Sequence, residues 1–194
     1  MPSDPIIFAG VELSSGRKPL TFAGLDEELN ITVLEKRDSS ELLAFLKDYE
    51  NCSLAVNLPS TKAGKDVYAD LKAKSLRAEF KPFSQKSHPK QWLETNAQDC
   101  FQALSGHKLF PRRALEGRLQ RSAILYEQGL QIADPIDIFE EITRYKLIQG
   151  ILPLDKLPSA NELDALVAAY LAWLSLNRPG QIVPKGEFVL PAGE

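Results

Sequence analysis

The first sixty residues carry an order of strand and helix patterns that few folds accommodate. Residues 6–14 (IIFAGVELS) and 20–26 (LTFAGLD) are β-rich runs separated by a turn, and residues 29–35 (LNITVLE) alternate apolar and polar side chains. A helix pattern, SELLAFLKDY, capped by Ser39 or Ser40, leads to SLAVNLP, an apolar run typical of a buried parallel strand. We therefore predict an antiparallel meander followed by a right-handed crossover to a fourth strand.

The remainder of the chain is mostly helical in pattern. Residues 61–106 are polar and interrupted by KPFSQKSHPK, and we expect them to form a helical insertion over the sheet. The later patterns predict a helix over 113–128 ended by Gly129, a short strand over 136–139, the helix EEITRYKLIQG, a capped helix from Ser159 and a C-terminal hairpin. The predicted architecture is a single α/β domain over residues 1–194, with the mixed five-stranded sheet of a ribonuclease H-like core and helices on both faces.

Composition narrows the class of protein. The chain has 194 residues, of which 44% are hydrophobic, and this supports one domain with a sizeable core. A net charge of −3 gives no whole-chain field that would attract nucleic acid. Cys52 and Cys100 lack metal-type spacing, and neither a signal peptide nor a membrane-length apolar run is evident, so we expect a cytoplasmic protein with reduced thiols and no membrane partner. With only His88 and His107, a His-rich zinc site is ruled out and a histidine-based triad is disfavoured.

Acidic and amide side chains occur in several of the predicted strands and in the last long helix. They are Glu12 in the first strand, Asn57 at the end of the fourth, Asp137 at the start of the later strand and Asp164 in the last long helix. If the first and fourth strands are neighbours, Glu12 and Asn57 converge, and the packed helix brings in Asp164. Phosphoryl transfer by two metal ions needs several carboxylates in one place. We therefore predict catalysis by Glu12, Asp137 and Asp164 around Mg²⁺ or Mn²⁺, with Asn57 as an amide ligand.

Asp164 also has a purely structural explanation. It falls on the shoulder of an apolar helix stripe, near the start of a helix in which Ser159 and Glu162 fit a capping box. Glu162 is thereby assigned to the cap. Asp164 is left with two alternatives, a first-turn acid that complements the helix dipole or a member of a site.

Two groups of basic residues are candidates for nucleic-acid binding. The first comprises Lys72, Lys74 and Arg77, with Phe80, Phe83 and Trp92 nearby, and the second comprises Arg112, Arg113, Arg118 and Arg121. Basic residues interleaved with aromatic rings hold phosphates and stack bases, and arginine suits bidentate phosphate contacts. The alternatives are a solvated helix face over core aromatics for the first group and intramolecular ion pairs for the second.

Several stretches resemble a known family. AGVELS, AVNLP, GRLQRSAILYEQG leading into DIFEE, and NELDALVAAYLAW are similar to the uncharacterised predicted nucleases with a ribonuclease H-like fold, domain-of-unknown-function family 429. The resemblance covers most of the chain outside residues 61–106 and implies that fold and a metal-dependent nuclease activity. Asp137 and Asp164 match acids of the family. Glu12 and Asn57 stand where members usually carry aspartate, and Asn161 stands where a related resolvase branch often has a second acid.

Two functions fit this pattern. In the first, the chain is a metal-dependent nuclease or related phosphoryl-transfer protein, in which a metal-activated water attacks a phosphodiester held by the basic residues. In the second, it is a non-catalytic ribonuclease H-like binding or scaffold protein that has lost the metal site. The amides at Asn57 and Asn161 favour the second, whereas Glu12 and Asp164 favour the first. A salt-bridged cluster around these two acids would count against the metal site.

Overall fold

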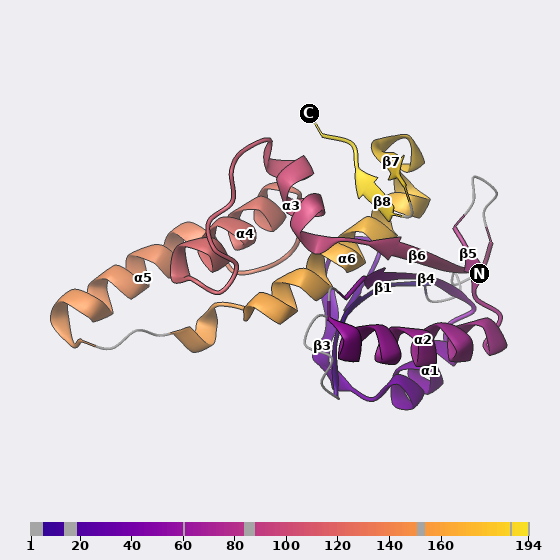
Figure 1. Cartoon of the computed structure of the whole chain (residues 1–194). Helices are drawn as coiled ribbons and strands as arrows, with labels where there is room; N and C mark the ends of the chain where they lie inside the picture. Colours follow the sequence, from indigo (N-terminus) through magenta and orange to yellow (C-terminus); the bar gives the residue numbers. More distant parts are fainter. Residues whose placement is uncertain are drawn as a thin grey trace.

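The computed structural model describes residues 6–13, 19–59, 61–83, 88–150, 154–186 and 188–193, which form an α/β fold (Figure 1). Its elements are β1 (Ile6–Glu12), β2 (Leu20–Leu25), β3 (Ile31–Arg37), α1 (Ser39–Lys47), β4 (Asn51–Asn57), α2 (Lys62–Arg77), β5 (Lys81–Pro82), β6 (Lys90–Thr95), α3 (Ala97–Ser105), α4 (Leu115–Glu127), α5 (Pro135–Ile148), the 3-10 helix η1 (Leu154–Lys156), α6 (Ala160–Asn177), the 3-10 helix η2 (Pro179–Gln181), β7 (Ile182–Lys185) and β8 (Phe188–Pro191). None of the described helices is both long and apolar enough to cross a membrane.

The main sheet is mixed and has the strand order β3-β2-β1-β4-β6-β5. The strands β1, β2 and β3 form an antiparallel meander, and α1 crosses over to β4, which pairs parallel to β1. The meander and the crossover predicted from the sequence are therefore confirmed. The sheet has six strands rather than the expected five, because both β6 and the two-residue β5 join it in parallel.

The expectation of a helical insertion over residues 61–106 is wrong in part. Helices α2 and α3 lie in this segment, but β6 lies between them and pairs with β4 over its whole length. In β6 the consecutive residues Gln91, Trp92 and Leu93 are all buried, because helices or loops cover the strand on both faces. A strand covered on both faces shows no alternation of apolar and polar residues, and six residues are too few to reveal a period.

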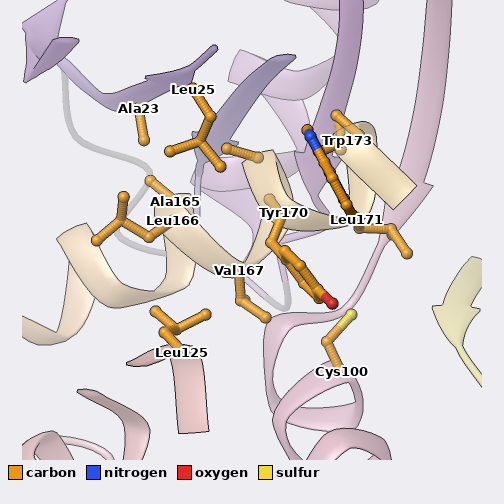
Figure 2. Packing of buried hydrophobic residues seen from close by; sticks show 14 of the residues in the cluster. Ala23, Leu25, Cys100, Leu125, Ala165, Leu166, Val167, Tyr170, Leu171 and Trp173 are labelled. Atoms are coloured by element: carbon orange, nitrogen blue, oxygen red, sulfur yellow. The ribbon is translucent and has the colours of Figure 1, made fainter. Parts of the chain in front are cut away.

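Helices cover both faces of the sheet, as predicted, and each face has its own core (Figure 1). Helices α1 and α2 pack on one face, and α6 crosses the other, where nearly all of its side chains are buried. The approach of α6 to β1 depends on Gly10, since a Cβ there would lie 2.0 Å from the Ala165 carbonyl oxygen. Figure 2 shows Ala165, Tyr170 and Trp173 of α6 among side chains from the sheet, α3 and α4.

Helices α4 and α5 with η1 form an arm that extends away from the sheet (Figure 1). A small core of Ile138, Ile142 and Leu157, flanked by Leu115 and Leu119, holds the arm together.

The prediction of a strand over residues 136–139 is wrong, because these residues belong to α5. Asp134 caps α5 by accepting a hydrogen bond from the Ile136 amide at 2.8 Å, and Pro135 is preorganised for the first helical turn, so the segment begins a helix.

The predicted boundaries of α1, α4 and α6 hold to within a few residues, whereas α5 begins at Pro135 instead of Glu140. Helix α1 is capped by Asp38 rather than by Ser39 or Ser40, in a capping box with Glu41. Helix α4 ends at Glu127, and Gly129 follows with a φ of 90°, the left-handed conformation expected of it. The predicted capping box of Ser159 and Glu162 at the start of α6 and the C-terminal hairpin of β7 and β8 are confirmed.

Candidate functional site

Glu12 and Asn57 meet at the carboxyl ends of two neighbouring parallel strands. They are register partners at the ends of β1 and β4, and both are almost fully buried. Asn57 donates a hydrogen bond from Nδ2 to Glu12 Oε2, and its Oδ1 accepts one of 2.8 Å from the Ala97 amide at the start of α3. The carboxamide therefore does what a carboxylate could not do in this position, because it donates to Glu12 on one side and accepts from α3 on the other.

Arg112 brings Asp164 into the same group of residues. It lies between α3 and α4, and its Nε donates to Asp164 Oδ2 at 2.5 Å. Its Nη2 donates to Asn161 Oδ1 at 2.7 Å and lies 3.9 Å from Glu12 Oε1. One guanidinium therefore contacts acids from β1 and from α6. We call Glu12, Asn57, Arg112, Asn161 and Asp164 the Arg112 cluster.

The electrostatics of the Arg112 cluster are dominated by burial. Asp164 is 4% exposed, and its pKa is raised from 3.8 to about 6, first by burial and second by the negative charge of Glu12. Arg112 and, more weakly, Arg121 act in the opposite direction. Because the pKa rises despite a direct ion pair with Arg112, the loss of hydration and the nearby acid outweigh that pairing. Asp164 is thus more than a first-turn acid, since it is a buried carboxyl group held by a long-range partner.

This raised pKa predicts a pH dependence of stability. The folded chain holds the Asp164 proton up to about pH 6, whereas the unfolded chain releases it near the ordinary value of 3.8. Between those values the folded state binds more protons, so the free energy of unfolding falls as pH rises, by an amount on the order of 3 kcal/mol. Asp164→Asn should flatten this part of the curve, measured by urea unfolding from pH 4 to pH 7. Asp66→Asn, an exposed change on α2, should follow the wild-type curve. Parallel curves for wild type and Asp164→Asn would contradict the assignment.

Asp137, the fourth predicted site residue, does not join the cluster. It is exposed in the first turn of α5, on the arm, because the segment predicted as a strand is a helix. Within the described residues, no group of three or more His, Cys, Asp or Glu side chains is arranged to hold a metal ion. The structure therefore brings together Glu12, Asn57 and Asp164 but separates Asp137 from them, and it adds Arg112, which sequence reasoning had assigned to nucleic acid.

Most of the predicted nucleic-acid ligands have partners inside the protein. Lys72 pairs with Glu94 at 2.6 Å, and Lys74 pairs with Asp70 at 2.8 Å. Among the predicted basic residues, Arg77 and Arg113 are exposed, and the Lys72 side chain stays 43% exposed despite its ion pair.

Two of the predicted arginines are structural. Arg118 donates to the backbone carbonyl oxygens of Pro158 and Leu154 at 3.0 and 3.2 Å, which ties the arm to the start of α6. Arg121 is 1% exposed and donates to Gln98 and to the Gly117 carbonyl oxygen. The assignment of Arg121 to phosphate binding is therefore corrected, because its guanidinium is enclosed by protein.

No protein-family model matches the chain, and no curated protein or solved structure matches it.

Proposed function

We propose that this chain is a non-catalytic ribonuclease H-like protein, a binding or scaffold protein in which an arginine occupies the place of catalytic metal ions. The observation that carries the proposal is the position of the Arg112 guanidinium, which contacts the carboxylates of both Glu12 and Asp164. A cation supplied by the protein itself thereby offsets part of the charge of the buried acids.

The strand order supports the ribonuclease H-like part of the proposal. A meander of three strands, a helical crossover to a parallel fourth strand and a further parallel strand is the layout expected of that core, and β3-β2-β1-β4-β6 follows it. Parts of the stretches that resemble family 429 lie on elements of this core: residues 9–12 of AGVELS on β1, residues 55–57 of AVNLP on β4, and NELDALVAAYLAW on α6. These three elements supply Glu12, Asn57 and Asp164.

The hydrogen bonds of the cluster support the non-catalytic part. A pair of metal ions needs carboxylate oxygens that are free to coordinate it. Here Asp164 Oδ2 accepts from Arg112, Glu12 Oε2 accepts from Asn57, and the Asn57 oxygen accepts from the Ala97 amide. The one remaining acid of the predicted set, Asp137, lies on the arm.

A metal-dependent nuclease is the second candidate, and one observation favours it. Glu12 and Asp164 converge with Asn57 at the carboxyl edge of parallel strands, where ligands of α/β sheets usually bind. Arg112 lies in an irregular stretch and is partly exposed, so a rearrangement of that stretch would release both acids. In this alternative, Glu12 and Asp164 would hold Mg²⁺ or Mn²⁺, which supplies an activated water for phosphodiester hydrolysis.

Calorimetry and cleavage assays distinguish the two candidates. Titration of wild-type protein with Mn²⁺ should give no saturable heat at submillimolar concentrations, because Arg112 already pairs with both acids and donates to Asp164. Single- and double-stranded DNA and RNA should remain intact in Mg²⁺ or Mn²⁺.

Two variants make this result decisive. Metal-dependent cleavage that is lost in Glu12→Gln and kept in Asp137→Asn would replace the scaffold proposal with the nuclease. Asp137→Asn is the matched control, because it removes an acid that the structure places outside the Arg112 cluster.

A further inference from the structure

The arm carries most of the exposed large hydrophobic side chains of the described residues. Tyr126, Ile136, Phe139, Ile148 and Leu154 all lie on α4, α5 or η1. Ile136 and Ile148, near the two ends of α5, are 66% and 73% exposed. Exposed apolar side chains gathered on one projecting element are typical of an interaction surface.

Four exposed residues of α5 form a ridge with a distinctive order. Ile136, Glu140, Arg144 and Ile148 follow one another at four-residue spacing, so they lie along a single i±4 row of the helix. The opposite side of α5 is used internally, since Ile138 and Ile142 are buried in the core of the arm. We call these four residues the α5 ridge.

The α5 ridge is complementary to itself when its direction is reversed. Read from the N-terminus, its order is apolar, acidic, basic, apolar, and read from the C-terminus it is apolar, basic, acidic, apolar. If a second α5 crosses the first so that the two ridges run antiparallel and meet at their midpoints, each Glu140 lies opposite an Arg144 and each Ile136 opposite an Ile148. Within the described part of the chain, neither Glu140 nor Arg144 forms an ion pair.

A groove adjoins the ridge, and Glu140, Arg144 and Ile148 of the ridge form part of its wall. It has a volume of about 590 Å³, and its lining includes Asp137, Glu141, Tyr145 and Gln149 together with members of the α5 ridge. Helices pack by placing the ridge of one into the groove of the other. A ridge and an adjoining groove on the same helix are what a two-fold interface needs, because each copy presents the same surface to its partner.

From this pattern we infer that two copies of the chain pair through crossed α5 helices whose ridges run antiparallel, with reciprocal contacts between Glu140 and Arg144 and apolar contacts between Ile136 and Ile148. The arm extends from the sheet (Figure 1), and α5 contributes no residue to the Arg112 cluster.

Charge-reversal variants test the pairing, and their effect on dimer affinity can be distinguished from a loss of folding. Sedimentation equilibrium of the wild-type chain should show a reversible monomer–dimer equilibrium. Its dissociation constant should be below roughly 200 µM, as expected of a small interface. Glu140→Arg and Arg144→Glu should each weaken the dimer by about tenfold or more, because each places like charges together twice. An equimolar mixture of the two variants should regain the wild-type affinity, because one copy then contributes only acids and the other only bases.

Two further charge-reversal variants, at exposed positions outside α5, serve as controls. Glu28→Arg and Arg77→Glu make the same charge changes at exposed positions outside α5 and should leave the dimer unchanged. Circular dichroism checks that every variant is folded. A wild-type chain that stays monomeric up to roughly 200 µM would overturn the inference. Single variants that dimerise like wild type, or a mixture that fails to recover, would overturn it as well.

Discussion

Arg112→Met should lower the free energy of unfolding at about pH 7 by about 3–5 kcal/mol, the usual cost of removing one partner from a buried ion pair. The change leaves Glu12 and Asp164 buried side by side without the guanidinium that contacts both. Urea unfolding followed by circular dichroism measures the loss. The loss should shrink towards pH 5, because Asp164, with a pKa raised to about 6, becomes neutral and needs no counter-charge.

The neighbouring residue supplies the control. Arg113 is exposed, so Arg113→Met makes the same chemical change beside the cluster and should shift the free energy of unfolding by no more than about 0.5 kcal/mol. The double variant Arg112→Met with Asp164→Asn should be more stable than Arg112→Met alone, because one of the two buried charges is gone. Equal stabilities of Arg112→Met and Arg113→Met would show that Arg112 does not hold the cluster, and the proposed function would lose its main support.

Asn57→Asp should lower the free energy of unfolding by about 3 kcal/mol at pH 7, since a buried hydrogen bond is lost and a like charge is added. In the wild-type chain, Asn57 Nδ2 donates to Glu12 Oε2, and a carboxylate in that place has no proton to donate. The acceptor role towards the Ala97 amide would remain. Thermal and urea unfolding give the difference.

Mn²⁺ should restore part of the stability of Asn57→Asp and leave the wild-type chain unchanged. Three neighbouring carboxylates attract a hard cation more strongly than two acids paired with an arginine, and binding to the folded state alone stabilises it. Asn51→Asp, the same change at the opposite end of β4, is the control and should show no response to Mn²⁺. If Asn57→Asp is as stable as wild type and equally indifferent to Mn²⁺, the carboxamide is not required between Glu12 and α3.

Local patterns were sufficient for the elements whose signals lie within a few consecutive residues. The strands β1 to β4, helix α1 and the capping box of Ser159 and Glu162 were predicted because alternation, apolar runs and cap residues act over short distances. The neighbouring positions of β1 and β4 also followed, since a crossover through a helix joins parallel strands. The convergence of Glu12 and Asn57 could therefore be predicted from the sequence.

Where an element is defined by its surroundings, the sequence was misleading. Strand β6 is buried on both faces, so its residues show no period, and it was included in a helical insertion. The apolar residues at 136–139 suggested a strand, but Asp134 and Pro135 begin a helix there. That error placed Asp137 in the predicted site, although it lies on the arm.

By itself, the sequence determined which chemical groups stand at the ends of β1 and β4 and within α6, because hydrophobic periodicity sets the strands and helices on which they lie. Only the tertiary structure decided which cation pairs with the two acids. Arg112 is 52 residues from Asp164 along the chain, and their contact depends on how the stretch between α3 and α4 folds back over α6. Such a contact leaves no local pattern, since the cost of burying two acids requires a cation nearby but does not specify which residue supplies it.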